Sequence, residues 1–238
     1  MDPEGAESQQ PFPRAPGRGG WKSGSRKRHQ EQNPNVHLSK AMSYILRHGA
    51  VQLGLEMGAD GFVDVAALLS LQRFRGVSVA DVRHVVETNE KCRFALRPHP
   101  SDGRLQIRAN QGHSLQQVSD LELTPLLEPT DLPHTMAHGT YLRHWPAICR
   151  GGLSRMGRNH IHLAPGLPED GHVLSGMRQD CDVAIVIDGP KALADGIQFY
   201  RSANGVILTS GDAEGLLPPR YFKRVLQLRP DRRLLPLE

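Results

Sequence analysis

The sequence predicts an α+β fold in two lobes joined by a linker. Three short helical patterns followed by a β-hairpin pattern make up the N-terminal half. The C-terminal half is a series of short apolar segments separated by turns, without the regular alternation of strands and long helices that a doubly wound parallel sheet requires. Between the halves, residues 116–133 contain Pro125, Pro129 and Pro133 with acidic residues among them, a composition typical of a linker.

The first ordered element is expected to be a helix that begins near Asn33 and Pro34. Asn can cap a helix, and Pro fits the first helical turn. The apolar residues of this helix recur at helical spacing: Leu38, Met42, Ile45 and Leu46. Residues 1–33 are rich in Pro, Gly, Gln and Ser, so we expect them to form a disordered tail. The basic cluster at residues 26–28 fits either a solvated segment or a localisation or RNA-contacting signal.

Two further short helices are expected after a turn at residues 60–61. Asp64 is the expected N-cap of the second helix, whose apolar residues lie between positions 63 and 69. Ser78, with Asp81 three residues later, marks the start of the third helix. The expected buried stripe of the third helix is Val79, Val82, Val85 and Val86.

A β-hairpin completes the N-terminal lobe. Phe94 and Leu96 alternate with polar or small residues, a Ser-Asp-Gly turn follows at 101–103, and Leu105 and Ile107 alternate on the return. Three short helices followed by a hairpin is the order of a winged-helix module, which often contacts nucleic acid. We therefore expect a winged-helix-like lobe over residues 34–115.

The second lobe is expected over residues 134–228, with a short tail at 229–238. Apolar runs predict strands at 161–163, 183–187, 205–208 and 222–228, and one helix is predicted at 145–149. No internal repeat is visible.

The composition restricts the class of protein. The chain has 238 residues, of which 38% are hydrophobic, and this is typical of a globular protein. Its net charge of +4 favours polyanionic partners without requiring one. The three cysteines lack paired spacing, which argues against a disulfide framework and for a reducing compartment. No apolar run is long enough to span a bilayer and no signal peptide is apparent, so we expect a protein of the cytoplasm, the nucleus or both, with no membrane partner.

Several common active-site motifs are absent from the sequence. It has no Gly-x-Gly-x-x-Gly after a strand, no Walker-type loop and no Gly-x-Ser-x-Gly elbow, which argues against a Rossmann dehydrogenase and a nucleoside triphosphatase. His160 and His162 lack partners at familiar metal-binding spacings, and their alternation also fits the wall of a pocket. We therefore expect no metal.

The dipeptide Arg47-His48 stands where the apolar pattern of the first helix ends. Arg is always charged and binds phosphate oxygens with a planar fork, and His can add a second hydrogen bond and titrates near neutral pH. The pair thus predicts a phosphate-binding site. Taken alone, such a pair more often only complements the negative C-terminal end of a helix, and it is the other motifs that favour phosphate binding.

Six motifs in the same order and at matching spacing resemble those of the KptA-type RNA 2′-phosphotransferases. The sequence as a whole resembles an animal member of this family. The six motifs cover about residues 38–228: Leu-Arg-His at 46–48, Arg-Phe at 93–94, Ile-Arg-Ala-Asn-Gln-Gly-His-Ser at 107–114, His-Gly-Thr at 138–140, Arg-Asn-His-Ile-His-Leu at 158–163 and Ser-Ala-Asn-Gly-Val at 202–206. The resemblance implies a winged-helix lobe joined to a C-terminal ADP-ribosyltransferase-like mixed β lobe, with the active site in the cleft between them.

The resemblance also implies the reaction. Members of the family remove the splice-junction 2′-phosphate of ligated tRNA and consume NAD as the acceptor. The RNA 2′-phosphate displaces nicotinamide, which gives an RNA-2′-phospho-ADP-ribose intermediate. The ribose 2″-hydroxyl then attacks the phosphate and releases 2′-OH RNA and ADP-ribose 1″,2″-cyclic phosphate. The expected partners are RNA with an internal 2′-phosphate and NAD, no cofactor is expected to be bound permanently, and we expect a monomer.

The site residues follow from the same motifs. The Arg-His-Arg-Arg tetrad of the family falls on Arg47, His48, Arg93 and Arg158. The first three are expected to clamp the RNA phosphate, and Arg158 is expected to stabilise the final transesterification. The expected NAD-binding residues are His138, Gly139, Thr140, His162, Asn204 and Gly205. Four further residues are typical of the family: Gln111, Gly112, His113 and Ser114. We expect them to have a structural role at the junction between the lobes.

Two other functions remain open from the sequence. The first is NAD-dependent ADP-ribosylation of terminal RNA phosphates, which uses the same first step and stops there. The second is a non-catalytic winged-helix module that only binds nucleic acid. The last motif, Ser-Ala-Asn-Gly-Val, lacks the glutamate with which many ADP-ribosyltransferases orient the ribose, and this fits a phosphate nucleophile that is already charged.

Overall fold

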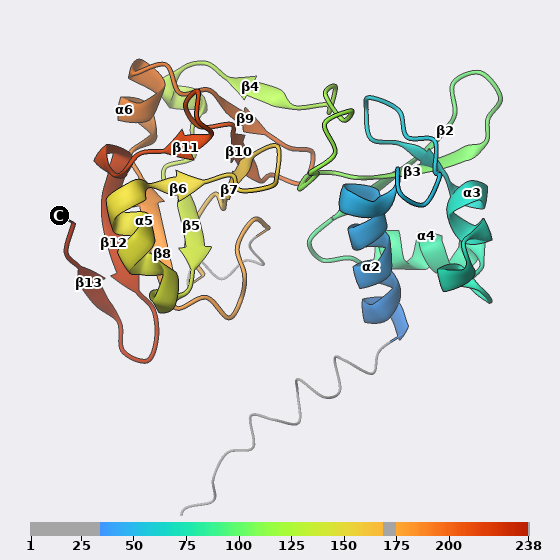
Figure 1. Ribbon diagram of the computed structural model, residues 1–238, viewed down its shortest axis with the longest axis horizontal. Helices are drawn as coiled ribbons and strands as arrows, with labels where there is room; N and C mark the ends of the chain where they lie inside the picture. Colours follow the sequence, from blue (N-terminus) through green and yellow to red (C-terminus); the bar gives the residue numbers. More distant parts are fainter. Residues whose placement is uncertain (1–33, 169–174, 238) are drawn as a thin grey trace, which may run out of the picture.

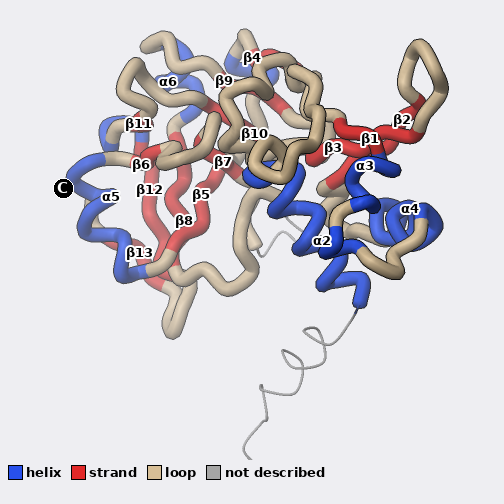
Figure 2. The backbone as a smooth tube through the Cα atoms, turned by 45° about the vertical axis from the view of Figure 1, so that its right-hand side comes forward, coloured by secondary structure: helices blue, strands red, loops and turns tan. Residues whose placement is uncertain are grey.

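The computed structural model describes residues 34–168 and 175–237 and has an α+β fold with several antiparallel sheets and few helices (Figure 1). The α-helices of the N-terminal half gather on one side of the molecule, and most of the strands belong to the other side (Figure 2). Each half has its own cluster of buried apolar side chains. Within the described residues, no helix is long and apolar enough to span a membrane.

The first helix, α2 (Pro34–Tyr44), begins at the proline that the sequence indicated, and the expected cap Asn33 lies outside the described residues. It buries Ala41 and Met42 and then widens into one π-helical turn, η1 (Ile45–Gly49). Single π-helical turns of this kind are rare and frequently occur at functional sites. Here the turn carries Arg47 and His48.

The caps of the next two helices are confirmed. The Asp64 carboxylate accepts hydrogen bonds from the N–H groups of Ala66 and Ala67 at the start of α3 (Val65–Ser70), at 2.7 and 3.3 Å. Ser78 and Asp81 form a reciprocal capping box at the start of α4 (Val79–Glu87). Such a box satisfies two backbone donors that the helix itself leaves free.

The stripe predicted for α4 is only partly right. Val82 and Val85 are buried as predicted. Val79 is 42% exposed, because it is the first residue of the helix and lies at the edge of the core.

The predicted hairpin is confirmed as β2 (Phe94–Pro98) and β3 (Leu105–Ala109), paired antiparallel from Phe94↔Ala109 to Pro98↔Leu105. A third short strand, β1 (Val63–Asp64), pairs with β3 and completes a sheet of order β1-β3-β2. A 3₁₀ turn, η2 (Gln72–Phe74), connects α3 to α4. The core of this half lies between the three helices and the sheet and includes Met42, Leu68, Phe74 and Ile107.

The C-terminal half contains two four-stranded antiparallel sheets, of order β4-β9-β10-β7 and β13-β12-β8-β5, and the small sheet β11-β6. The strands are β4 (Thr124–Leu126), β5 (Ala137–Thr140), β6 (Leu153–Ser154), β7 (Ile161–Leu163), β8 (Val183–Ile187), β9 (Phe199–Arg201), β10 (Ile207–Thr209), β11 (Leu216–Leu217), β12 (Phe222–Gln227) and β13 (Arg233–Leu235). The helices are α5 (Trp145–Gly151) and α6 (Gly189–Ala194), and the 3₁₀ turns are η3 (Pro129–Asp131), η4 (Leu142–His144) and η5 (Pro219–Tyr221).

Two strands lie in segments that the sequence indicated as a linker and a tail. Within residues 116–133, β4 pairs with β9 through Pro125↔Tyr200. Pro has no backbone N–H to donate to a neighbouring strand, and β4 is accordingly an edge strand. Within residues 229–238, β13 pairs with β12 and forms the edge of the other sheet. Both segments therefore contribute to the sheets of the C-terminal half.

The two large sheets meet at β5 and β7, where Ala137 and Ala164 form an isolated antiparallel bridge. The core between them includes Ile161, Leu163, Ile185 and Phe199. All five residues of β8 are buried, which explains why the sequence shows an unbroken apolar run there.

Candidate functional site

Arg47 and His48 occupy the last turn of the first helical segment, and both side chains are half-buried. The His48 Nδ1 atom lies 2.8 Å from the Ser114 hydroxyl oxygen, and this contact leaves the other ring nitrogen as the one for a ligand. The Arg47 Nε atom is buried and has no hydrogen-bond partner among the described residues.

Three guanidinium groups from distant parts of the sequence come together at this point. Burial first, and then the positive charges of Arg93 and Arg158, together lower the pKa of Arg47 to about 10. The same two kinds of cause, burial and then the charge of Arg158, lower the pKa of His48. Within residues 34–168 and 175–237, none of the three arginines forms a salt bridge with a carboxylate. Half-buried cations that lie near like charges and have no carboxylate partner are an arrangement that an anion would stabilise.

Arg93 is held just before β2. The Asn89 side-chain oxygen accepts hydrogen bonds from the Arg93 backbone N–H at 3.2 Å and from its guanidinium at 3.3 Å. On the other side, the Arg93 carbonyl accepts from the N–H of Asn110 at 2.8 Å. Burial lowers the pKa of Arg93.

Arg158 is exposed and lies in the turn before β7. Its carbonyl accepts a hydrogen bond from the Arg155 guanidinium at 3.0 Å. The next residue, Asn159, donates its backbone N–H to the His113 carbonyl at 2.9 Å and its amide to the carbonyls of Leu115 and Val118 at 3.2 Å. The loop that carries Arg158 is thus fixed to the N-terminal half.

Residues 111–114 position the Arg47-His48 pair, a role that the motif spacing alone did not reveal. The Ser114 backbone N–H donates to the Arg47 carbonyl at 3.0 Å, in addition to the contact of its hydroxyl with His48. Gly112 has a φ of +93°, and a Cβ there would lie 3.2 Å from the Arg47 Nε atom. His113 is buried, and its pKa is lowered to about 4 by burial and then by the charge of Arg47.

His138 and His162 lie on neighbouring strands, β5 and β7. The His138 Nδ1–H donates to the His162 carbonyl at 3.0 Å. His162 is only 8% exposed, and its pKa is lowered to about 3 by burial and then by the charges of Arg158 and Arg47. Its Nε2 atom has no hydrogen-bond partner among the described residues. His162 is therefore expected to be neutral, and its buried Nε2 atom is a hydrogen-bonding group that the described residues leave unpaired.

The other residues predicted to bind NAD have structural contacts of their own. A Cβ at Gly139 would overlap the Met177 side chain, so packing against Met177 is one reason for a glycine there. Thr140 is buried, and its carbonyl accepts from the Asp182 N–H at 2.9 Å. Gly205 has a φ of +78° in a turn, a conformation that favours glycine.

Asn204 contacts the N-terminal half. Its amide donates to the Lys91 carbonyl at 2.9 Å, two residues before Arg93. The Lys91 ammonium in turn donates to the Met177 carbonyl at 3.1 Å. Asn204 thus joins the halves beside one of the clustered arginines.

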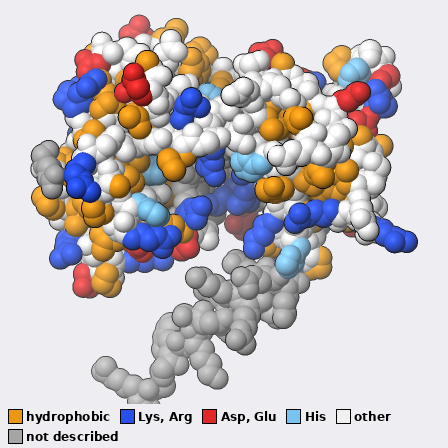
Figure 3. Space-filling view, viewed as in Figure 1, with side chains coloured by type: hydrophobic (Ala, Val, Ile, Leu, Met, Phe, Trp, Pro, Cys, Tyr) orange, Lys and Arg blue, Asp and Glu red, His pale blue; other side chains and the backbone are white. Residues whose placement is uncertain are grey.

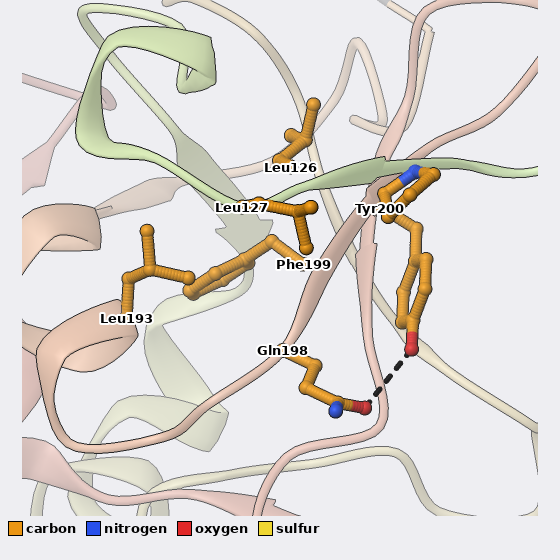
Figure 4. A pocket seen from close by; sticks show the side chains of 7 residues that line it. Leu126, Leu127, Leu193, Gln198, Phe199 and Tyr200 are labelled. Carbon is orange, nitrogen blue, oxygen red and sulfur yellow. Dashed lines mark hydrogen bonds between the residues drawn. The ribbon is translucent and has the colours of Figure 1, made fainter.

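Two cavities lie near the junction and in the C-terminal half. One, of about 250 Å³, is bordered by Val118, Ser119, Leu121, Leu123, His160, Tyr200 and Ser210. The other, of about 100 Å³, is an apolar pocket between β4, α6 and β9, and the Tyr200 hydroxyl donates to Gln198 at its edge (Figure 4). Of the predicted site residues, none lines either cavity. Lys and Arg side chains instead gather in the hollow between the two halves (Figure 3).

The sequence was compared with known families and proteins. The model of the RNA 2′-phosphotransferase, Tpt1 / KptA family matches residues 33–211. The chain belongs to this family. A "tRNA 2′-phosphotransferase 1" of Bos taurus is 63% identical over 209 residues, which cover 87% of this chain and 82% of that protein.

Similarity to members of the RNA 2′-phosphotransferase family extends well beyond mammals. The "tRNA 2′-phosphotransferase 1" of Homo sapiens is 61% identical over 88% of this chain and 83% of its own length. The "tRNA 2′-phosphotransferase" of Saccharomyces cerevisiae is 38% identical over 76% of this chain and 81% of its own length. The names of these relatives describe a transferase, and the matched residues 33–211 include every clustered cation described above.

Proposed function

We propose that this protein transfers the splice-junction 2′-phosphate of ligated tRNA to NAD. The observation that carries the proposal is the group of three guanidiniums with His48, in which Arg158 is exposed, the other members are half-buried, and none has a carboxylate partner among the described residues. Such a group is stabilised by a dianionic phosphate, which supplies the missing negative charge. The relatives named tRNA 2′-phosphotransferase support the choice of RNA as the phosphate donor.

In this proposal, Arg47, His48 and Arg93 bind the RNA 2′-phosphate. Their fixed positions orient one phosphate oxygen for attack, which replaces a bimolecular encounter by a positioned one. Burial strengthens the electrostatic attraction because less water competes for the phosphate oxygens. Ser114 fixes the ring orientation of His48 through the 2.8 Å contact at Nδ1.

NAD is proposed as the second substrate, beside β5 and β7. The fit rests on His162, whose buried Nε2 atom lacks a partner among the described residues and whose neutral ring can bind without adding charge. His138 supports His162 through its hydrogen bond to the His162 carbonyl. Thr140, Asn204 and Gly205 are proposed to lie around the ribose and nicotinamide, with Asn204 acting at least in part through its bond to Lys91.

The proposed reaction has two steps. In the first, an oxygen of the RNA 2′-phosphate attacks C1″ of the nicotinamide ribose, and the glycosidic C–N bond breaks with its electrons leaving on nicotinamide. In the second, the ribose 2″-oxygen attacks the phosphorus and the bond to the RNA 2′-oxygen breaks. The proton of the 2″-hydroxyl ends on the RNA 2′-oxygen, and ADP-ribose 1″,2″-cyclic phosphate is released. Arg158, on the opposite half from the other cations, is proposed to stabilise the charge that develops in this second step.

We also propose finer descriptions of the two halves. The three helices and the sheet β1-β3-β2 support a winged-helix lobe over residues 34–115. The two antiparallel sheets of the C-terminal half support an ADP-ribosyltransferase-like lobe over residues 134–228, to which β4 and β13 add an edge strand each from outside that range. In this arrangement the first lobe presents the RNA phosphate and the second presents NAD.

The test is to mix the purified protein with RNA that carries one internal 2′-phosphate, with and without NAD, and to measure the masses of the RNA and the small molecules. We expect NAD-dependent loss of the phosphate together with formation of ADP-ribose 1″,2″-cyclic phosphate. Stable addition of ADP-ribose to RNA without phosphate loss would instead indicate modification of RNA phosphates. RNA that remains unchanged with NAD would favour a module that only binds nucleic acid.

A further inference from the structure

A basic and aromatic surface lies on the C-terminal half beside the clustered arginines. It consists of Tyr141, Arg143, His144 and Arg178, and we refer to it as the Tyr141 surface. Tyr141 directly follows β5, and Arg178 comes shortly before β8, which pairs with β5. Arg143, His144 and Arg178 are exposed. Figure 3 shows Lys and Arg side chains that continue from the hollow between the halves onto the lower part of the C-terminal half.

The planar groups of this surface are held together by direct contacts. The Arg143 guanidinium lies 4.6 Å from the centre of the Tyr141 ring, and the Arg178 guanidinium lies 5.7 Å from it. Arg178 also donates to the Tyr141 hydroxyl at 3.2 Å. These contacts order two flexible cations on one aromatic ring, so less side-chain entropy is lost when a ligand binds.

Two carboxylates lie beside the surface without pairing with its arginines, those of Asp180 and Asp182, and the Asp182 carboxylate accepts from the Leu142 N–H at 3.2 Å. Within the described residues, neither Arg143 nor Arg178 forms a salt bridge with a carboxylate. Asp180 is reached only through the Tyr141 hydroxyl, which donates to its carboxylate at 3.2 Å. Arg143 donates its Nε–H to the His144 Nε2 atom at 3.2 Å. Two exposed cations of this kind attract a polyanion.

The surface is continuous with the candidate site. Arg178 follows Met177, whose carbonyl accepts from the Lys91 ammonium at 3.1 Å, and Lys91 lies two residues before Arg93. The charge of Arg178 also contributes, after burial, to the lowered pKa of Arg158. Several cations beside the site suit a ligand with one phosphate per repeating unit better than they suit the single diphosphate of NAD.

We propose that the Tyr141 surface binds the single-stranded RNA segment next to the nucleotide that carries the 2′-phosphate. The arginines contact backbone phosphates, and a base stacks on the planar side chains, as in other surfaces that combine cations with aromatic rings. This inference rests on the proposed function, which places an internal 2′-phosphate, and hence a continuing strand, at the site.

The test compares Arg143→Gln with the wild type on two RNAs that carry the same internal 2′-phosphate, a dinucleotide and a fluorescent dodecamer. Dodecamer binding without NAD is measured by fluorescence anisotropy at several salt concentrations. We expect the Kd of the variant to rise about fivefold, and the slope of log K against log salt to fall by about 0.7, the value for one lost phosphate contact on a single strand. Turnover of the dinucleotide and the KM for NAD are expected to stay unchanged. Arg224→Gln, which removes an exposed cation of β12, is the matched control and is expected to bind like the wild type.

Dodecamer binding by Arg143→Gln with unchanged Kd and salt slope would overturn the inference. So would a raised KM for NAD with unchanged RNA binding, because the surface would then belong to the dinucleotide. The proposed function fails separately, if the wild type does not remove the 2′-phosphate of the dinucleotide with NAD, and the anisotropy measurement still tests the RNA surface in that case.

Discussion

Lowering the pH from 7 to 5 is expected to destabilise the folded protein through its buried histidines, and His162 allows the effect to be calculated. This side chain is 8% exposed, and burial together with the charges of Arg158 and Arg47 lowers its pKa to about 3. In the unfolded chain the same imidazole has an ordinary pKa of about 6.5. Below that pH the unfolded chain binds a proton that the folded protein does not.

The direction and the size of the effect follow from this difference. Because the unfolded state gains protons first, the free energy of unfolding falls as the pH drops below about 6.5 and continues to fall until the folded pKa is reached. At about 1.36 kcal/mol per pH unit, His162 alone removes about 2 kcal/mol between pH 7 and pH 5. His113, whose pKa is lowered to about 4, is expected to remove a similar amount.

The assay is urea unfolding at pH 7 and at pH 5 for the wild type, His162→Asn and His134→Asn. Asn keeps a polar side chain and does not titrate, so the stability of His162→Asn is expected to fall by about 2 kcal/mol less than that of the wild type. His134 is exposed and serves as the control, and its variant is expected to fall by as much as the wild type. If His162→Asn and the wild type lose equal stability, the reasoning about a neutral, buried His162 is refuted.

Three further predictions concern the site. Arg158→Ala is expected to accumulate the RNA-2′-phospho-ADP-ribose intermediate, which is detected by mass, whereas Arg47→Ala or Arg93→Ala is expected to slow both steps. A normal product yield from Arg158→Ala without trapped intermediate would contradict this assignment. Ser114→Ala loses the 2.8 Å contact with His48, and since such a bond contributes about 1 kcal/mol, kcat is expected to fall about fivefold in single-turnover assays; an unchanged kcat removes Ser114 from the positioning of His48. Gly112→Ala strains a backbone at φ +93° and crowds Arg47, so a lowered Tm and weaker RNA binding are expected, and wild-type values of both would contradict the close approach.

Local structure in the N-terminal half was largely predictable because its signals are local. The caps Asp64 and Ser78 lie next to the helices they start, and the hairpin turn lies between the strands it joins. The π-helical turn at Ile45–Gly49 was not predictable, because its wider hydrogen bonding has no pattern of side chains that separates it from an α-helix. The exposure of Val79 was missed because periodicity does not show where a helix extends past the core.

The edge strands of the C-terminal half were missed for a different reason. Pro125 and the acidic residues around it are typical of a linker, and only the pairing with β9, about 75 positions later, makes residues 124–126 a strand. The same holds for residues 233–235, which pair with β12. Strand pairing over such distances depends on tertiary structure and leaves little trace in the local sequence.

The candidate site was likewise predictable only in part. Residue types and motif order identified Arg47, Arg93 and Arg158 as a group, and in the structure the charges of Arg93 and Arg158 contribute to the lowered pKa of Arg47. The roles of Ser114 and Asn204 were not visible, because a serine that contacts His48 and an asparagine that donates to a backbone carbonyl have no distinctive spacing. The contacts that hold a site together are therefore harder to predict than the residues that do its chemistry.

The interlobe contacts explain how three repelling cations remain in place without substrate. The Asn159 backbone N–H donates to the His113 carbonyl, and the Asn204 amide donates to the Lys91 carbonyl. Asn159 is adjacent to Arg158 in the sequence, and Lys91 lies two positions before Arg93. The same loops therefore form both the junction between the halves and the anion site. Repulsion among the arginines acts to separate these loops, and a bound phosphate dianion removes that repulsion. Binding of the RNA phosphate is therefore expected to stabilise the junction of the two halves together with the site.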